Sequence, residues 1–247
     1  EDTLWFFSNL DAPNGKILSL KIENLNFKWS EVISEKKFPI SGASIAGDKI
    51  IINYLVDTIS KVEFYDLNGN FLEQLSFEGK GTLAGFSGKL GNEVAYFEFS
   101  NFTSPQRIFE LDLNTLEYKL YWETIIKGLK VENYESNLNF YKSKDGTDIP
   151  IHIAHKKGLE ISSETPVLLY GYGGFNISIL PYFSKTFYMW IKSGGVLAVA
   201  NLRGGGEYGD SWHKSGMLLN KQNVFDDFAF AAKHLHSEGI GSPDTTA

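Results

Sequence analysis

Hydrophobic and polar residues alternate in short runs through the first half of the chain. Six runs rich in Ile, Val, Phe and Tyr predict β-strands: Leu4–Phe7, Lys16–Ile22, Lys49–Val56, Ser60–Tyr65, Glu93–Phe99 and Arg107–Leu111. Asn, Gly, Asp and Pro separate these runs, as turns between strands require. No helical period is evident before about residue 125. We therefore expect an all-β first half.

The predicted strands recur in a loose repeat. Gly47–Ile50 corresponds to Gly91–Val94, and Asp66–Asn68 corresponds to Asp112–Asn114, with Ile22–Leu25 at a similar phase upstream. The period of roughly 43 to 46 residues is the size of one four-stranded propeller blade. About three blades fit into this stretch, and propellers close with roughly four to eight, so we expect a partial β-propeller. The alternative is a β-sandwich, whose strands recur about every 8–12 residues without a longer period.

A different pattern begins near residues 125–135. Strands at Tyr134–Ser143 and Asp148–His155 flank a Lys-Asp-Gly-Thr turn and predict a hairpin. Two fully apolar strands follow, at Pro166–Tyr170 and Gly195–Asn201. Continuous apolar strands alternating with helices are typical of a parallel sheet that is covered on both faces. We therefore divide the chain into a propeller domain, residues 1–127, and the first half of an α/β domain, residues 128–247.

Two helices are expected in the second domain. One lies around Phe183–Lys192, between the apolar strands, and an amphipathic helix runs from about Asn223 to Glu238 after a long loop. Asp226 and Asp227 are expected in the first turn of the later helix, where carboxylates favour the helix dipole. Gly239 is expected to end it.

Composition narrows the function. The 247 residues carry a net charge of −7, which argues against binding to a nucleic-acid backbone. No apolar run approaches the roughly 18 residues that a membrane span needs. The absence of cysteine excludes disulfides, thiolate metal sites and cysteine nucleophiles. The five histidines are not spaced as ligands; for example, His152 and His155 point to opposite faces of a strand, so we expect no metal and no cofactor.

A glycine-rich segment at 204–209 follows the second apolar strand and matches G-x-G-x-x-G. This pattern occurs in dinucleotide-binding folds, where a helix begins inside the motif and holds the pyrophosphate. Here residues 207–213 are expected to continue as loop. We therefore favour a tight structural loop at the strand end over a nucleotide site.

No serine has the G-x-S-x-G context of an α/β-hydrolase nucleophile. In that fold the nucleophile follows a strand, and the acid and the histidine come later in the chain. The corresponding strand would come after the helix that ends near Glu238. We therefore expect the nucleophile outside these 247 residues and regard the chain as a fragment.

Several motifs in the second half, taken together and in order, resemble the prolyl oligopeptidase family of serine peptidases. They are Ser143–Pro150, Tyr170–Ser178, Asn201–Gly209, Trp212–Lys214 and Lys221–Phe228. The Tyr-Gly-Gly-Phe-Asn form at 172–176 is similar to the proline-specific endopeptidase branch. The family combines a seven-bladed propeller with an α/β-hydrolase domain and cleaves peptides after proline.

The resemblance implies roles for individual residues. Tyr172 would donate its O–H in the oxyanion hole, and Phe175 would line the pocket for the substrate proline; on the residues alone, we would favour a core tyrosine whose hydroxyl is hydrogen-bonded. Side-chain donors that stabilise an oxyanion contribute about 3 kcal/mol to catalysis. A possible site loop contributes four further residues: Arg203, Glu207, Tyr208 and Trp212. For Arg203 and Glu207 we favour an ion pair that stabilises the loop.

The chain also departs from the family. The nucleophile, its acid and its histidine have no counterpart, so we expect this chain alone to be inactive. After Pro243 the family continues into an apolar strand, whereas Asp244–Ala247 lacks that character. The partners implied are short proline-containing peptides, and the full-length protein is expected to be monomeric and cytoplasmic. The alternative is a non-catalytic binding protein that contains a propeller.

Overall fold

The computed structural model describes residues 3–23 and 26–247, so the repeat copy predicted at Ile22–Leu25 lies partly outside the described residues. The chain divides into two compact units. The first takes the described residues up to Phe99, with Arg107–Glu123 and Tyr208–Ser211. The second takes Ser100–Gln106, Thr124–Glu207 and Trp212–Ala247.

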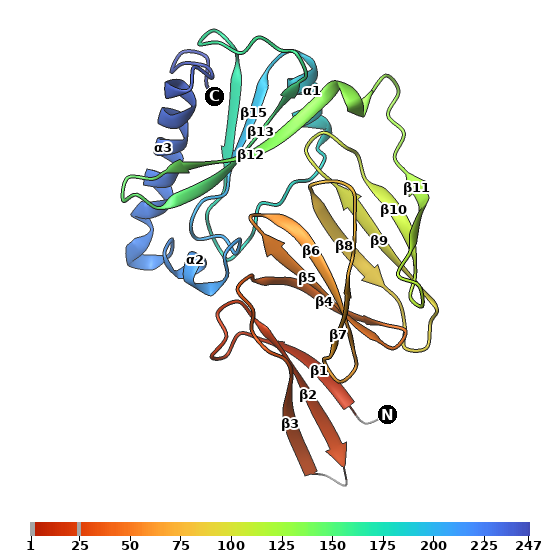
Figure 1. The fold of residues 1–247 in the computed structure, drawn as a ribbon. Coiled ribbons are helices and arrows are strands. Elements are labelled where there is room, and N and C mark those ends of the chain that lie inside the picture. The colour runs from red at the N-terminus through yellow and green to blue at the C-terminus, as the bar shows by residue number, and fades with distance from the viewer. Residues whose placement is uncertain (1–2, 24–25) are drawn as a thin grey trace. The chain divides into compact units, whose positions relative to one another are not determined.

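The first unit consists of three antiparallel sheets, each built from consecutive strands (Figure 1). The first sheet contains β1 (Thr3–Ser8), β2 (Lys16–Glu23) and β3 (Asn26–Ile33). The second contains β4 (Ile40–Ala46), β5 (Lys49–Val56), β6 (Ile59–Asp66) and β7 (Phe71–Gln74). The third contains β8 (Thr82–Ser87), β9 (Val94–Ser100), β10 (Arg107–Asp112) and β11 (Tyr118–Glu123). Successive sheets of consecutive strands, two of them four-stranded, are the blade arrangement that the repeat predicts.

Alternation along β5 shows how the sheets stack. Ile50, Ile52 and Tyr54 point to the first sheet, where they pack with Ile17. Ile51 points to the other face, into a core shared with the third sheet. Successive side chains of a strand point to opposite faces of its sheet. A sheet that lies between two others therefore needs apolar residues at both odd and even positions of its strands. The run Lys49–Val56 meets this requirement.

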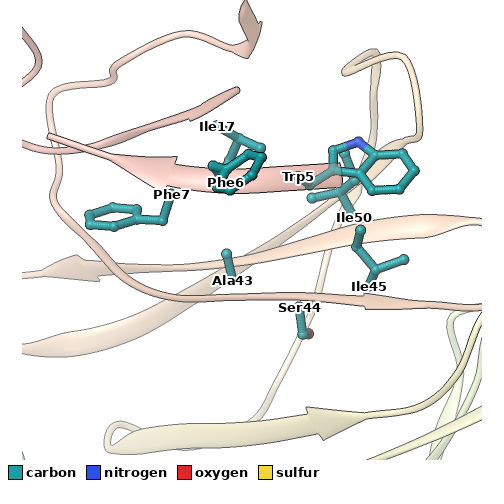
Figure 2. Close-up of a pocket in the computed structure, with 8 residues that line it drawn as sticks. All are labelled: Trp5, Phe6, Phe7, Ile17, Ala43, Ser44, Ile45 and Ile50. Carbon is teal, nitrogen blue, oxygen red and sulfur yellow. The ribbon is translucent and has the colours of Figure 1, made fainter. Parts of the chain in front are cut away.

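The first unit contains a cavity of about 320 Å³ between its first two sheets (Figure 2). Its lining is mostly apolar, with the Ser44 hydroxyl and the Trp5 indole N–H as the polar side-chain groups: Trp5, Phe6, Phe7, Ile17, Ala43, Ser44, Ile45 and Ile50. The Ser44 Oγ donates to the Phe86 carbonyl at 3.1 Å. Binding sites combine an apolar lining with convergent polar groups. This cavity offers no such convergence, and we assign it to packing between the sheets.

The second unit is built on one mixed sheet, ordered β12-β13-β15-β14. Its strands are β12 (Tyr134–Lys142), β13 (Asp148–Lys156), β14 (Val167–Gly171) and β15 (Val196–Ala200). Only β14 and β15 run parallel; β13 joins β15 antiparallel, pairing Ile151 with Ala200. The predicted hairpin and the parallel arrangement of the two apolar strands are both confirmed, and the sequence did not predict that the hairpin joins the same sheet.

Helices cover both faces of this sheet, as expected. α1 (Lys185–Lys192) packs Phe187 and Ile191 against Leu197 and Val199 of β15. α3 (Gln222–Ser237) packs Ala231 and Leu235 on the opposite face, with other residues of the same strand. The remaining helical segments are short: η1 (Val131–Asn133), α2 (Asp210–Lys214) and η2 (Leu218–Asn220).

Three predictions near the C-terminus need comment. α3 begins at Gln222, one residue earlier than expected, so Asp226 and Asp227 lie in its second turn and not in its first. Gly239 follows the helix with φ +74°, which confirms the predicted stop. Residues 245–247 do extend the sheet, because Val167 N donates to the Thr245 carbonyl and Ala247 N donates to the Val167 carbonyl, both at 2.9 Å. Pairing between backbone groups requires no apolar side chain. The composition of residues 244–247 therefore did not predict that they pair with β14.

Candidate functional site

The turn that follows β14 carries the two most exposed of the predicted site residues. Tyr172 comes directly after Gly171, the last residue of β14, and its side chain is 44% exposed. Phe175 lies three residues further on and is 83% exposed. The carboxyl end of a parallel strand is where α/β sheets place their ligand sites. Tyr172 is therefore a partly exposed tyrosine at the expected location.

The backbone of this turn is strained. Gly173, Phe175 and Asn176 have φ of +59°, +53° and +58°. A non-glycine residue in the left-handed region costs roughly 1–3 kcal/mol and persists only where the surroundings enforce it. Because Phe175 and Asn176 are adjacent and both have positive φ, contacts from neighbouring segments must hold the turn in this conformation.

The glycine-rich loop at 204–206 provides part of this support. The Asn176 amide donates to the Gly204 carbonyl at 3.1 Å. A Cβ on Gly204 would lie 2.8 Å from the Gly173 carbonyl oxygen, and one on Gly206 would lie 2.9 Å from the Asn176 carbonyl oxygen. Two backbones approach closely here because neither loop residue has a side chain.

This contact also bears on the nucleotide interpretation. The space beside Gly204 and Gly206, which a pyrophosphate would need, is filled by the chain's own 173–176 turn. The segment after the motif, expected as loop, contains the five-residue helix α2, which starts at Asp210 and not inside the motif. The geometry therefore favours the structural loop over a dinucleotide site.

His213 adds a second support. Its Nδ1 lies 2.8 Å from the Gly204 carbonyl oxygen and 3.1 Å from the Asn176 amide nitrogen. We assign a proton to Nδ1, because the shorter contact is to a carbonyl, which only accepts. The Gly204 carbonyl then accepts from both the imidazole and the Asn176 amide. His213 is thus a hydrogen-bonded histidine, as expected.

Lys221 is a contact that the sequence interpretation missed. It precedes α3 directly, and its Nζ donates to the Gly173 carbonyl at 2.6 Å. The sequence shows it only as one letter of the Lys221–Phe228 motif. A partner 48 positions away leaves no local signal.

Arg203 does not form the expected ion pair with Glu207. Its guanidinium instead binds Asp227 through Nη2 at 2.6 Å and through Nε at 3.0 Å, and it binds Asp145 through Nη1 at 2.5 Å. The Arg203 side chain is only 6% exposed and that of Asp227 is fully buried. The planar guanidinium can donate two parallel hydrogen bonds to one carboxylate, as it does to Asp227. The carboxylate of Glu207 instead accepts from the Ile179 amide and from Asn201.

These neighbours shift pKa values. Hydrogen bonds from Arg203 lower the pKa of Asp145 to about 2. Burial alone would lower the pKa of Arg203, but its bonds to Asp227 and Asp145 more than offset this and raise it. Arg203 is therefore a permanent charge that is neutralised inside the unit.

Glu207 is 1% exposed and supports the loop separately. Its Oε1 accepts from the Ile179 amide at 2.9 Å and from Asn201 Nδ2 at 3.3 Å. Burial raises the pKa of Glu207 above its ordinary value. Its role in the structure is to fix the segment that follows the Phe175 turn.

The other two loop residues also make structural contacts. Trp212 is partly buried against the core of the second unit and donates its Nε1 to the Leu202 carbonyl at 3.2 Å. Tyr208 belongs to the first unit, where its hydroxyl donates to Asp57 Oδ1 at 3.0 Å. Within the part of the chain that the structure describes, no group of three or more His, Asp or Glu residues is arranged to hold a metal. No helix formed by residues 3–23 or 26–247 has the length and apolar character to cross a bilayer.

Two family models match the chain. The model for the prolyl oligopeptidase N-terminal β-propeller domain matches residues 1–124, and the model for the prolyl oligopeptidase family matches residues 181–247. A prolyl endopeptidase of Elizabethkingia meningoseptica is 38% identical over 247 residues, covering 100% of this chain and 35% of the relative. A prolyl endopeptidase of Dictyostelium discoideum is 37% identical over 256 residues, covering 98% and 34%. The chain thus spans about a third of the length of these relatives.

Solved structures agree with this assignment. One from an analysis of two prolyl endopeptidases has a TM-score of 0.93 at 34% identity, covering 100% of this chain and 36% of that one. Prolyl oligopeptidase B from Galerina marginata, bound to a 25-residue macrocyclisation substrate, has a TM-score of 0.92 at 27% identity, covering 99% and 35%. The predicted fold class, blades of a β-propeller followed by the first part of an α/β-hydrolase domain, is confirmed. The chain belongs to the prolyl oligopeptidase family.

Proposed function

We propose that this chain is part of a serine endopeptidase that cleaves short peptides on the carboxyl side of proline. Family membership supports the reaction class, and prolyl endopeptidases are among its relatives. The observation that carries the proposal for this chain is Tyr172, an exposed phenol at the carboxyl end of β14 on a turn held from several sides. We place the domain boundary between residues 127 and 128, in the segment between β11 and η1.

The proposed reaction is acyl transfer. A serine attacks the carbonyl carbon of the substrate proline, negative charge develops on that carbonyl's oxygen in the tetrahedral intermediate, and the amine of the following residue leaves. Tyr172 donates its O–H to that oxygen, and Phe175 presents its ring to the proline of the substrate. The serine, its histidine and its acid are supplied by parts of the protein outside these 247 residues. Because the charge exists only beyond the ground state, Tyr172 accelerates the chemical step more than it tightens substrate binding.

Replacing Tyr172 with phenylalanine tests this role in the complete gene product. The hydroxyl is lost and the ring is kept, so we expect kcat on a Gly-Pro reporter peptide to fall about 10²- to 10³-fold. KM should change little. Tyr182→Phe is a matched control, because Tyr182 is similarly exposed, at 45%, and has no proposed role. Unchanged kcat in Tyr172→Phe would exclude the oxyanion role, and a wild-type protein without peptidase activity would exclude the whole proposal.

The proposal also includes a monomeric state and a cytoplasmic location. The net charge of −7 supports the monomer, since a net charge far from zero opposes self-association. Gel filtration and cell fractionation of the complete gene product test both statements.

A further inference from the structure

Lys221 reaches the turn that carries Tyr172 from the side of α3. Its ammonium donates to the Gly173 carbonyl at 2.6 Å, a short, charge-assisted hydrogen bond. The Lys221 side chain is partly buried. A long, flexible side chain held in this way loses rotamer freedom, so the contact has to stabilise the turn by more than that loss.

Gly174 lies between Lys221 and the ring of Tyr172, with room for a methyl group. A Cβ on Gly174 would lie 3.6 Å from Lys221 Nζ and 3.9 Å from Cε1 of the Tyr172 ring. The ammonium and the edge of the phenol ring therefore flank one point. Lys221 therefore supports the middle of the Tyr172–Gly174 segment through its hydrogen bond at Gly173.

The charge of Lys221 has no carboxylate partner among residues 3–23 and 26–247. Its remaining described contact is the Phe225 ring, whose centroid lies 6.0 Å from Nζ. Arg203, by contrast, is neutralised by Asp145 and Asp227. A positive charge that no carboxylate neutralises raises the local potential and favours any negative charge that develops nearby.

We propose that Lys221 is a positioning residue of the oxyanion site: it fixes the turn that presents Tyr172, and its charge strengthens the stabilisation that Tyr172 provides. This inference rests on the proposed function of Tyr172. Lys221 does not touch the reacting atoms and acts through the tyrosine.

The experiment compares variants of Lys221 in the complete gene product. Lys221→Met removes the charge and the donor, and we expect kcat on the Gly-Pro reporter to fall about 10- to 100-fold, the range for a hydrogen bond to a charged group. KM should change less than about twofold, because the effect belongs to the chemical step. Lys221→Arg keeps a donor and the charge, and should restore most of kcat. Lys233→Met is the control, since Lys233 is an exposed lysine on the same helix.

A double-mutant cycle separates this inference from the proposed function. In Tyr172→Phe, the further loss caused by Lys221→Met should nearly vanish, because coupled residues are not additive. Multiplicative losses, or a lowered melting temperature with unchanged kcat, would overturn the role of Lys221 while leaving that of Tyr172 intact. An inactive wild type, or full kcat in Tyr172→Phe, would instead remove the proposed function. If Lys221→Met does not fold, Lys221→Gln replaces it in the same cycle and should show the same coupling.

Discussion

Two adjacent glycines in the turn after β14 have opposite surroundings. Gly173 has φ +59°, and a Cβ there would lie 2.4 Å from Val224 Cγ1 and 2.9 Å from the Arg203 carbonyl oxygen. A Cβ on Gly174 would make only ordinary contacts, at 3.6 and 3.9 Å. Gly173 is therefore required by the closeness of α3 and the 202–204 loop, whereas Gly174 is not required sterically.

This difference predicts unequal effects of alanine. Gly173→Ala should lower the free energy of unfolding by about 2–4 kcal/mol, since it combines overpacking with a left-handed alanine. Gly174→Ala should change it by less than about 0.5 kcal/mol, as for a substitution without strain. Urea unfolding of both variants beside the wild type gives the comparison. Equal losses would mean that the turn relaxes as a whole and that the close contacts at Gly173 do not define it.

At the level of single residues, the sequence located the candidate side chains along the fold but did not predict their contacts. Tyr172 and Phe175 were placed correctly at the strand end, because they lie next to an apolar strand that is readily recognised. The ion-pair partner predicted for Arg203 was wrong. The expected partner, Glu207, is four positions away, whereas the observed ones, Asp145 and Asp227, are 58 and 24 positions away. Such pairs arise only when the hairpin, β15 and α3 come together.

At the level of secondary-structure elements, the ion pairs of Arg203 connect three segments that are distant in the sequence. Its position follows the end of β15, Asp145 lies in the turn between β12 and β13, and Asp227 lies on α3. Ser143 Oγ also donates to Asp227 Oδ1, at 2.5 Å. The pair with Asp227 is almost completely buried, whereas Asp145 is 47% exposed. The two carboxylates should therefore contribute very differently to stability.

Arg203→Met should lower the free energy of unfolding by about 3–5 kcal/mol, because it leaves the Asp227 carboxylate buried without a counter-charge. Asp145→Asn should cost at most about 1 kcal/mol, since an exposed partner is screened by solvent. Arg203→Lys should fall between them, because an ammonium cannot bind both carboxylates as the fork does. Denaturant unfolding of the three variants, fitted with one common dependence of the free energy of unfolding on denaturant concentration, measures the three changes in stability. A cost of Asp145→Asn equal to that of Arg203→Met would contradict this division.

The strands that sequence missed show where periodicity fails. β7 is exposed at every position, and β11 is exposed at all but its first. A strand without a buried face has no alternation to detect, because its pairing is carried by backbone groups. β5 was predicted with its observed bounds, since both of its faces are buried. The lack of a buried face explains β7 and β11 but not β8, which was also missed although Leu83 and Phe86 are buried.

For the whole molecule, several titratable groups link stability to pH, and two of them, His152 in the second unit and Glu63 in the first, act in different pH ranges. In the second unit, His152 is 3% exposed beside the Phe102 ring, and burial lowers its pKa to about 4 from 6.5. In the first unit, burial would raise the pKa of Glu63, but hydrogen bonds from Lys36, Tyr65 and Lys61 outweigh it and lower the pKa to about 2 from 4.5. The pH range in which His152 affects stability therefore hardly overlaps the range in which Glu63 does.

Below pH 6.5 the unfolded chain protonates His152 while the folded unit does not, so the free energy of unfolding should fall by about 1.4 kcal/mol per pH unit until pH 4. Below pH 4.5 the Glu63 contribution is lost in turn, down to about pH 2. Urea titrations from pH 7 to pH 3 measure both slopes. His152→Gln should remove the slope between pH 6.5 and pH 4, Glu63→Gln should reduce the slope below pH 4.5, to which Asp145 also contributes, and the control His155→Gln should keep both slopes. An unchanged slope in His152→Gln would show that another group carries the upper slope, and the second unit would then owe its acid sensitivity to a different site.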